Sequence, residues 1–376
     1  MKAEGKTIAI VINTSWNIYN FREGLLRAFQ DSGYHVIAIA PFDDYAEKLE
    51  DLGFEYHNIN INNKGTNPVE DVKLIWAFYQ LYKRVKPDVL LLYTIKPNVY
   101  GTVAARLAGI PVISNISGLG TVFLDHSFSS KVARLLYKIA LRFPAKVFFQ
   151  NSEDRALFIH SKLVAEDKTG LLPGSGIDTD KYTPIDNERA NFPLSFLFIA
   201  RLVKDKGLVE FVDAARILKK KYPTVQFNVL GAFYPGNPTA ITEDEMVSWE
   251  QEGVVKYLGV SNDVPSLIAR ADCVVLPSYR EGLSRVLLEA ASMAKPIVTT
   301  DVPGCRNVVD DGVNGFLCKV KDAQDLALQM ERMIHLDDDQ RIEMGWKGRE
   351  KVVKEFDESI VIEEYQRVVR EVLGIS

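Results

Sequence analysis

Short runs of apolar residues alternate with longer amphipathic stretches along the whole chain. The runs are rich in valine and isoleucine and lack a regular polar–apolar alternation, a pattern typical of strands buried on both faces of a parallel sheet. In the first half of the chain they are Thr7–Ile12, Val36–Ala40, Glu55–Ile61, Val89–Tyr93, Val112–Ile116 and Val147–Gln150. In the second half they are Ser195–Ala200, Gln226–Leu230, Val254–Leu258, Cys273–Pro277, Ile297–Thr300 and Gly315–Cys318.

The stretches between the runs, such as Val209–Lys221 and Ser284–Met293, are long enough for helices that cross over between parallel strands. Two series of about six strands each therefore predict two doubly wound, Rossmann-like α/β domains. The length of 376 residues agrees, since it gives about 180 residues per domain. Such sheets bind ligands beyond the carboxyl ends of their strands, so we expect the two domains to face a cleft.

The boundary between the domains is expected in a stretch rich in turn residues, Pro173–Pro184, which suits neither a helix nor a central strand. We place the hinge near 183–193 and the first domain at 1–186. A long surface loop inside a single domain is the alternative.

Composition narrows the function further. The chain is 47% apolar and 25% charged with a net charge of −5, which argues against general nucleic-acid binding. Residues 1–190 carry 22 basic and 21 acidic side chains (+1), and the remainder 23 and 29 (−6), so an anionic partner should meet the first half. Cys273, Cys305 and Cys318 have no metal-site spacing, and a disulfide framework is not expected, which fits a reducing cytosol. Cys273 and Cys318, which lie in apolar runs, are expected to be small buried hydrophobes.

Candidate chemistry begins after the first strand of the second domain, where Arg201 and Lys206 precede Gly207 and a helix. Two fixed cations beside a helix N-terminus would bind a diphosphate. A solvated basic turn is an equally simple interpretation of this element alone.

A second element is Arg280–Ala290, in which a strand is followed by a turn, a glycine and a helix. We expect Glu281 to face a sugar whose phosphate is received by the amides of Gly282, Leu283 and Ser284. Glu289 lies on an apolar helical face, where an unpaired carboxylate is costly, and a ribose diol would suit it. The alternative is an ordinary helix with a structural ion pair.

Two glycine turns follow other strands of this domain. Gly231 ends one, and Gly259 with Val260 ends the other. Glycine there would let the backbone approach a planar base or ribose closely.

In this order and spacing, the motifs resemble the donor signature of family-4 retaining glycosyltransferases of the GT-B fold. The matching pieces are Ala200-Arg201, Lys206-Gly207, Glu281-Gly282, Leu288-Glu289-Ala290, Asp301–Gly304 and Asp311–Phe316. The resemblance implies that Arg201 and Lys206 contact the donor diphosphate, Glu281 the transferred sugar and Glu289 the ribose. Ser284 stands where proline is common, and Met293-Ala294 where a Cys-Gly or similar small pair is.

We therefore expect the nucleotide-sugar-binding, Rossmann-like domain at 187–356. The resemblance also implies a C-terminal helix at about 357–376 that returns to the first, acceptor-binding domain, and front-face displacement without a side-chain base. We expect no cofactor and no metal, because Arg201, Lys206 and a helix N-terminus already meet the leaving diphosphate. Asp178-Thr-Asp180 is interpreted as turn chemistry and Asp337–Asp339 as a helix cap.

The acceptor is expected in the first domain, at polar loops that follow its strands. The candidates are Asn13, Ser15, Asn17, Tyr19, Lys96, Asn98, Gly118 and Gly120. Lys96-Pro97-Asn98 is also open to interpretation as a simple chain turn. These loops look like those of a subgroup that acts on polyprenyl-diphosphate-linked sugars. They are similar to the corresponding loops of bacterial enzymes that add N-acetylgalactosamine to undecaprenyl-diphospho-diacetylbacillosamine.

A basic stripe supports a lipid-linked acceptor. Lys131, Arg134, Lys138 and Arg142 recur every three or four residues, beside apolar positions and without an acidic residue between Asp125 and Glu153. A basic amphipathic helix of this kind, ended by Pro144, would lie on an anionic membrane. The alternative is a core-packed helix with a solvated basic face.

We therefore predict a retaining, metal-independent hexosyltransferase, cytoplasmic and peripheral on the membrane, since the N-terminus shows no signal peptide and no run could span a bilayer. The expected partners are a UDP-sugar, a polyprenyl-diphosphate-linked saccharide and the inner-membrane surface. A soluble acceptor, a UDP-sugar 2-epimerase or hydrolase, and a non-catalytic sugar-nucleotide sensor are the alternatives.

Overall fold

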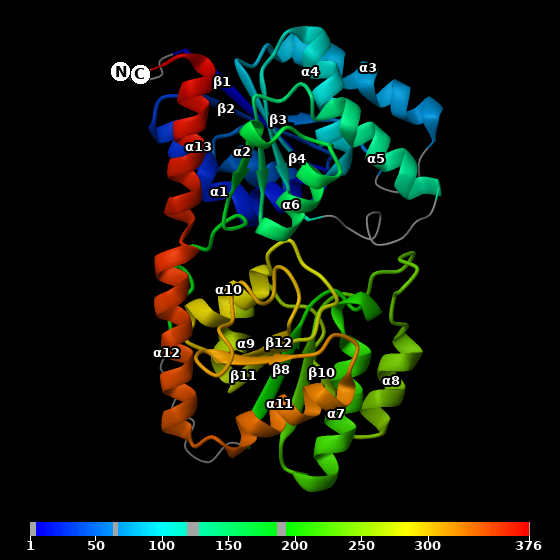
Figure 1. Cartoon of the computed structure of the whole chain (residues 1–376), viewed down its shortest axis with the longest axis vertical. Helices are drawn as coiled ribbons and strands as arrows, with labels where there is room; N and C mark the ends of the chain where they lie inside the picture. The colour runs from blue at the N-terminus through cyan, green and yellow to red at the C-terminus, as the bar shows by residue number, and fades with distance from the viewer. Residues whose placement is uncertain (1–4, 63–66, 119–127, 186–192, 376) are drawn as a thin grey trace. The chain divides into compact units, whose positions relative to one another are not determined.

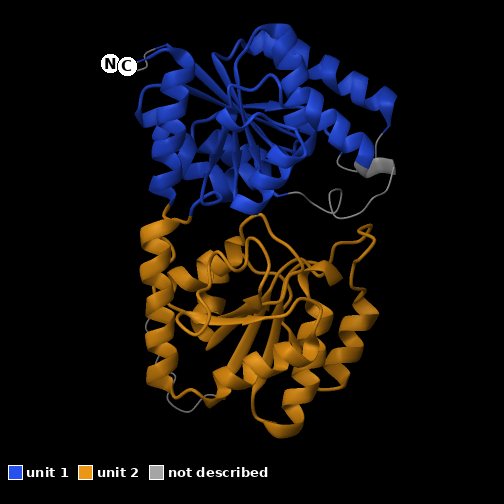
Figure 2. Ribbon diagram, in the orientation of Figure 1, with its two compact units in different colours: residues 1–176, 358–376 blue, residues 177–357 orange. Residues whose placement is uncertain are grey.

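The computed structural model describes residues 5–62, 67–118, 128–185 and 193–375. The chain separates into two compact units (Figure 2). Unit 1 contains residues 1–176 and 358–376, and unit 2 contains residues 177–357. Each unit is built on one parallel sheet with helices around it (Figure 1). The predicted pair of Rossmann-like α/β domains is confirmed.

The sheet of unit 1 has the strand order β3-β2-β1-β4-β5-β6-β7. Its strands are β1 (Thr7–Val11), β2 (His35–Ala40), β3 (Glu55–Asn58), β4 (Val89–Tyr93), β5 (Val112–Ile116), β6 (Lys146–Phe149) and β7 (Thr169–Leu171). The apolar runs locate the first six. The edge strand β7 has only three residues, one of them glycine, so no apolar run marks it.

Helices cover both faces of this sheet. One face packs against α3 (Pro68–Val85), α4 (Thr102–Ala108), α5 (Phe128–Ala140) and α6 (Ser152–His160). The other packs against α1 (Ser15–Asp31), α2 (Ala46–Asp51) and α13 (Glu358–Leu373). In β1, Ala9 and Val11 join the first core and Ile8 and Ile10 the second. Burial on both faces explains the missing alternation in the sequence.

Unit 2 has the strand order β10-β9-β8-β11-β12-β13 around a single core. Its strands are β8 (Ser195–Ile199), β9 (Gln226–Leu230), β10 (Lys256–Tyr257), β11 (Cys273–Leu276), β12 (Ile297–Thr300) and β13 (Gly315–Cys318). Its α-helices are α7 (Leu208–Lys221), α8 (Glu243–Gln251), α9 (Val264–Arg270), α10 (Arg285–Ser292), α11 (Ala323–His335) and α12 (Asp338–Glu355). All six strands and both named crossover helices follow the predicted pattern.

The division of the chain falls after Gly176 rather than after residue 186. From Ile177 onward the turn-rich segment belongs to unit 2. Ile177 donates its amide to the Phe356 carbonyl at 2.9 Å, and Thr179 donates its hydroxyl to Asp357 at 2.5 Å. The second crossing, after Asp357, brings α13 onto unit 1, where Tyr365 is buried against β4 and β6. The expected hinge at 183–193 lies largely outside the described residues.

The three cysteines are buried and free, and the expected burial of Cys273 and Cys318 is confirmed. Within the described ranges, no helix is long and apolar enough to cross a membrane.

Candidate active site

The donor motifs meet at the carboxyl ends of the strands of unit 2, and glycines let them approach. Gly207 has a φ of +77°, and a Cβ there would overlap the Pro277 carbonyl. Gly231 has a φ of +155°, and a Cβ there would overlap the Ala200 carbonyl. The chain therefore requires glycine at both positions, since any side chain would push the strand ends apart. The ends of β8, β9 and β11 thus form one compact edge.

Lys206 and Glu281 form an ion pair at this edge. Lys206 ends the 3₁₀ turn η4 (Lys204–Lys206), and its Nζ contacts Glu281 Oε1. Both side chains are mostly buried, at 21% and 14% exposed. The same turn is fixed to the segment that follows β11, because the Asp205 carbonyl accepts the Tyr279 amide at 2.9 Å. The two motifs, 75 residues apart, are thus brought together as one charged group.

The loop Asp301–Gly304 completes this group. The Glu281 amide donates to the Pro303 carbonyl at 3.2 Å, and the Ser284 amide donates to the Gly304 carbonyl at 3.0 Å. Gly304 has a φ of +80°, and a Cβ there would lie 2.6 Å from the Glu281 carbonyl carbon. Asn307 accepts the Gly304 amide at 2.8 Å. Sequence reasoning recognised this loop as a motif but gave it no place in the site, because its contacts are made by backbone.

Arg201 lies at the end of β8 and is exposed. Its guanidinium carbon is 4.9 Å from the centroid of the Tyr234 ring, a cation–π distance. Tyr234 follows β9 and is 42% exposed. Arg201 therefore keeps its donors toward solvent, where an anionic ligand can reach them.

Glu289 is buried within α10 and paired. Its Oε1 accepts from Arg285 Nε at 3.2 Å. Burial raises the pKa of this carboxyl, and the Arg285 charge and hydrogen bond oppose that shift. The ion-pair alternative therefore describes part of its surroundings, and the ribose role stays a prediction.

The remaining predicted donor positions differ in accessibility. Ser284 is the N-cap residue of α10 and is buried, with Gly282 buried beside it and Leu283 partly exposed. Gly259 has a φ of +74° with open space around it, and Val260 is 69% exposed. The Gly231 amide donates to the Gly259 carbonyl at 2.9 Å, so the two glycine turns are joined.

The acidic motifs that could suggest a metal are occupied locally. Asp178 Oδ1 accepts the amides of Asp180 and Lys181 at 3.0 and 2.8 Å, which makes it a turn residue as predicted. Asp337 caps α12 with Gln340 in a reciprocal capping box, also as predicted. In the part of the chain that the structure describes, no group of three metal-ligating side chains is close enough to hold an ion.

Four acceptor candidates lie in the β1–α1 loop or in the first turns of α1. Asn17 and Tyr19 are partly exposed on α1, as is Asn13 before it, and Lys48 lies 5.7 Å from the Tyr19 ring. Ser15 differs from the expectation, because it is fully buried and its hydroxyl donates to the Pro41 carbonyl at 2.8 Å. This bond joins the start of α1 to the segment that follows β2.

Lys96 and Asn98 are also engaged internally. Lys96 Nζ pairs with Asp71 Oδ1 at 3.0 Å, with side chains 14% and 11% exposed. Tyr100 donates its hydroxyl to the other Asp71 oxygen at 2.7 Å. Asn98 is fully buried and donates to the Asn115 carbonyl at 2.8 Å. Both side chains therefore have partners inside unit 1, and their acceptor role stays a prediction. Asp71 comes from α3, so the local motif contains no sign of it.

Two further residues mark the carboxyl edge of unit 1. Thr94 follows β4 with a φ of +62°, a conformation that is strained for a β-branched residue and that clusters at functional sites. Arg22 on α1 is 6% exposed and lies 4.6 Å over the Tyr93 ring. Among the described residues it has no ion pair, and its Nε has no hydrogen-bond partner. A buried guanidinium without a carboxylate is costly, which makes Arg22 a candidate for an anionic ligand.

The other first-domain candidates are only partly described. Gly118 has a φ of +139°, and Gly120 lies outside the described residues. Of the basic stripe, Lys131, Arg134 and Lys138 are on α5, with Lys131 and Lys138 exposed. Arg142 is exposed but does not lie on α5, because this helix ends at Ala140 and not, as predicted, at Pro144.

Two family models match the chain. Glycosyl transferase 4-like covers residues 7–151, and Glycosyl transferases group 1 covers residues 185–351. Together they span most of both units and include Arg22, Arg201, Lys206, Glu281 and Glu289. The chain therefore belongs to the group 1, GT4-like glycosyltransferases, with the GT-B fold. The predicted resemblance is confirmed.

Particular relatives define the neighbourhood within this family. The chain is 28% identical to N,N'-diacetylbacillosaminyl-diphospho-undecaprenol alpha-1,3-N-acetylgalactosaminyltransferase of Campylobacter jejuni, over 97% of this chain and 99% of the relative. It is 26% identical to UDP-Gal:alpha-D-GlcNAc-diphosphoundecaprenol alpha-1,3-galactosyltransferase of Escherichia coli, over 77% and 76%. Among solved structures, Anabaena Alr3699/HepE in complex with UDP and glucose matches with a TM-score of 0.80 at 20% identity, over 96% and 98%.

Proposed function

We propose that this glycosyltransferase moves an N-acetylhexosamine, such as N-acetylgalactosamine, from a UDP-sugar to an undecaprenyl-diphosphate-linked saccharide at the cytoplasmic membrane surface. Two relatives support the acceptor, because both are named for substrates carried on a diphosphate-linked undecaprenol. The full-length match to the first of them supports the donor sugar. We further propose that the reaction retains the anomeric configuration and requires no metal.

The Lys206–Glu281 pair is the single observation that supports this function most. It puts one cation and one carboxylate at the edge where a doubly wound sheet binds ligands. On donor binding, Lys206 and the exposed Arg201 receive the diphosphate, and the N-terminus of α10 adds its dipole. Glu281 then accepts hydrogen bonds from hydroxyls of the transferred sugar.

The same cations support the chemistry of the departing group. The bond between the anomeric carbon and the diphosphate oxygen breaks, and the acceptor hydroxyl forms the new bond on the same face. The acceptor proton passes to the departing phosphate oxygen, so the step balances without a side-chain base. Lys206 and Arg201 stabilise the charge that develops on the diphosphate, a type of contribution that removal typically shows to be worth about 3–4 kcal/mol.

On the acceptor side we assign the lipid diphosphate to Arg22. A phosphate oxygen would supply the negative partner that this buried guanidinium lacks among the described residues. Asn13, Asn17 and Tyr19, which begin the same helix or precede it, would contact the acceptor sugar. We also propose a peripheral position on the membrane, because the long, apolar undecaprenyl chain of the acceptor stays in the bilayer.

One experiment tests the whole proposal. The protein is incubated in EDTA with UDP- and GDP-sugars and with lipid-linked or soluble saccharide acceptors, and the anomeric configuration of the product is determined by NMR. We expect transfer from a UDP-N-acetylhexosamine to the lipid-linked acceptor only, with an α-linkage. Metal-dependent turnover, an inverted linkage or transfer to the soluble acceptor alone would contradict it.

A UDP-sugar epimerase or hydrolase is the second candidate, favoured by one observation. Asp71 provides the carboxylate that the loops of unit 1 lack in sequence, but Lys96 and Tyr100 already occupy both of its oxygens. Release of UDP at an equal rate with and without acceptor would favour this candidate.

A further inference from the structure

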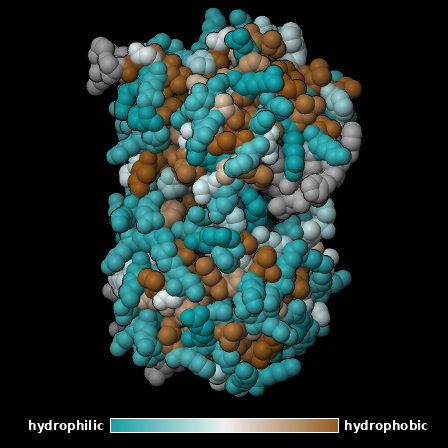
Figure 3. Space-filling model, viewed as in Figure 1, coloured by the Kyte–Doolittle hydropathy of each residue, from teal (hydrophilic) through white to brown (hydrophobic). Residues whose placement is uncertain are grey.

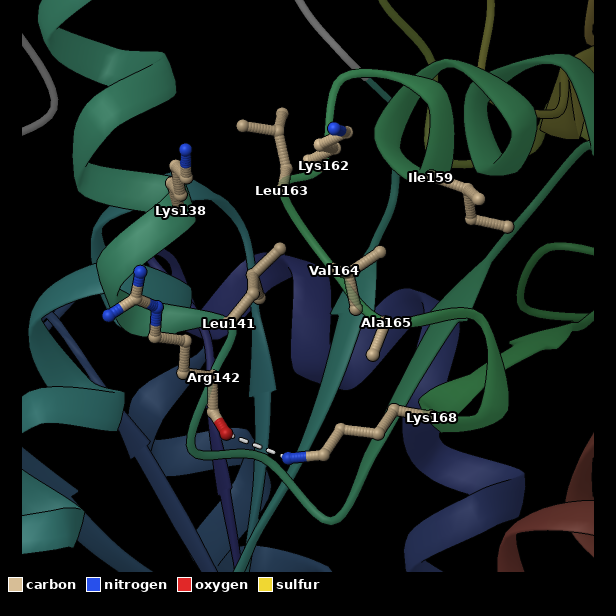
Figure 4. A pocket seen from close by; sticks show the side chains of 9 residues that line it. All are labelled: Lys138, Leu141, Arg142, Ile159, Lys162, Leu163, Val164, Ala165 and Lys168. Carbon is tan, nitrogen blue, oxygen red and sulfur yellow. Dashed lines mark hydrogen bonds between the residues drawn. The ribbon is translucent and has the colours of Figure 1, made fainter.

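A cavity of about 400 Å³ lies in unit 1 between the end of α5 and the segment that leads from α6 into β7. Its volume falls in the range of roughly 300–1,000 Å³ that small-molecule sites occupy. Figure 4 shows Lys138, Leu141 and Arg142 on one side and the segment from Ile159 to Lys168 around the rest. None of these residues belongs to the candidate donor site or to the acceptor candidates. Two of them, Lys138 and Arg142, belong to the basic stripe.

Charge is the clearest property of this cavity. Four cations line it, Lys138, Arg142, Lys162 and Lys168, together with apolar Leu141, Ile159, Leu163, Val164 and Ala165 and with no acidic side chain. Lys168 donates to the Arg142 carbonyl at 2.7 Å (Figure 4), which fixes the chain at the floor. The adjacent Glu166 is turned to Arg155, at 3.3 Å. Four like charges around one hollow favour an anion.

The position of the cavity separates it from the substrate edge. Arg142 precedes β6 and Lys168 directly precedes β7, so the cavity lies at the amino ends of these parallel strands. The acceptor candidates follow β1, β4 and β5, at the carboxyl ends. A ligand in the cavity therefore does not occupy the position of the reacting sugar.

An apolar surface adjoins the cations. Leu135 and Ile139 on α5 are 58% and 44% exposed, and Phe143 after it is 43% exposed. On a helix, Leu135 neighbours Lys138 by a spacing of three and Ile139 by a spacing of four. The Arg106 guanidinium lies 5.8 Å from the Phe143 ring. Hydrophobic side chains interrupt the hydrophilic surface in the region of α3, α4 and α5 (Figure 3). Basic side chains beside exposed apolar ones are the pattern of a surface that rests on anionic lipid.

We propose that this cavity binds the phosphate of an anionic phospholipid headgroup, while Leu135, Ile139 and Phe143 enter the acyl boundary. The inference rests on the proposed function, since it explains how the enzyme holds to the surface that carries its acceptor. Charge complementarity selects the lipid phosphate, and the apolar neighbours select a lipid over a free phosphate ion. The anchor is independent of the acceptor diphosphate, which Arg22 receives at the other edge of the sheet.

The test is sedimentation of the full-length protein with vesicles of phosphatidylglycerol and phosphatidylcholine, without donor or acceptor. Three variants each lose two lysines and one arginine. The cavity variant, K138Q/R142Q/K162Q, removes three of the four cations that line the cavity. The α3 variant, K73Q/K83Q/R84Q, changes the helix on which Val72 and Trp76 are also exposed. The control, K220Q/K256Q/R270Q, changes unit 2. We expect the cavity variant to lower the partition coefficient about 100-fold and each single change about fivefold. The unit 2 control should match the wild type.

Several outcomes would overturn the proposal. Equal loss in the unit 2 control would show a general charge effect, and a larger loss in the α3 variant would move the contact to that helix. Displacement by millimolar inorganic phosphate at matched ionic strength would make the cavity a free-phosphate site. Turnover with a short-chain, water-soluble acceptor should persist in the cavity variant. If the wild type binds vesicles through the cavity but transfers no sugar, the proposed function fails and the headgroup site stands.

Discussion

The carboxyl edges of the two sheets are built differently. In unit 2, the Glu281 and Ser284 amides are held by the Pro303 and Gly304 carbonyls, and Lys206 reaches Glu281 from another strand end. In unit 1, polar side chains near the strand ends bond to groups from other elements, as Lys96 does to Asp71 of α3 and Ser15 to the Pro41 carbonyl. A site whose geometry is set by backbone leaves its signature in the sequence as spaced glycines. A site set by side chains from distant elements leaves none.

Among the variants considered, Glu281→Gln should have the largest effect, and it acts on the carboxyl edge of unit 2, where we propose that the donor binds. The amide keeps the size of the side chain but loses the charge that pairs with Lys206 and accepts from sugar hydroxyls. We expect kcat to fall about 1,000-fold, the size of a lost transition-state contact, with UDP affinity changed less than about fivefold. Steady-state kinetics and UDP titration measure the two effects. Equal losses in both would show that Glu281 binds nucleotide rather than sugar.

Lys96→Met tests whether the acceptor edge is structural where the sequence suggested binding. Removing one member of a mostly buried ion pair leaves Asp71 uncompensated, which costs about 3 kcal/mol of the free energy of unfolding. The double variant K96M/D71N should recover much of that loss. Urea unfolding gives the four corners of this cycle. An intact stability with a raised KM for acceptor would instead restore the predicted binding role.

The contrast also explains what could be predicted from sequence. The strands of both sheets were visible because burial on both faces removes polar residues, and β7 was missed because a three-residue edge strand carries no such signal. The candidate donor site could be predicted because Lys206 and Glu281 directly precede glycines and Glu289 follows Glu281 at the spacing of the family motif. Asp71 was missed because its partner, Lys96, comes from another element. The burial of Ser15 was not expected, because its partner, the Pro41 carbonyl, also lies elsewhere in the chain. Burial of Asn98 depends on packing that no local pattern contains.

Gly304→Ala tests the backbone contact itself. A Cβ at this position meets both an unfavourable φ and the Glu281 backbone. We expect a loss of about 2–3 kcal/mol in the free energy of unfolding. Gly312→Ala is the matched control, because Gly312 has a similar φ of +75° with nothing within 4 Å. It should lose only about 1 kcal/mol. Equal losses in denaturant unfolding would mean that the close approach contributes nothing.

Arg22→Met tests whether the positive charge of Arg22, at the carboxyl edge of unit 1, binds the diphosphate of the lipid-linked acceptor. If the buried guanidinium receives the lipid diphosphate, its removal raises the KM for lipid-linked acceptor by about 10- to 100-fold, the value of a charge-assisted contact. The KM for UDP-sugar should stay unchanged. Arg27→Met on the same helix is the control, since Arg27 is exposed and pairs with Glu23. A rise in both KM values, or in neither, would remove Arg22 from the acceptor site.

The pH dependence of stability is the smallest expected effect and returns to the donor edge. Burial raises the folded-state pKa of Glu289 above its ordinary value of 4.5, so the folded protein holds this proton longer than the unfolded chain. The resulting contribution to stability is fully present below the ordinary value and is lost as pH rises through the folded pKa. Glu289→Gln lacks this loss, so its melting temperature relative to wild type should increase from acidic toward neutral pH.

UDP should reduce the difference, because ribose hydroxyls would stabilise the ionised carboxylate. A difference that is flat with pH would show that Arg285 fully compensates the buried charge, and a difference unaffected by UDP would leave Glu289 as a structural residue.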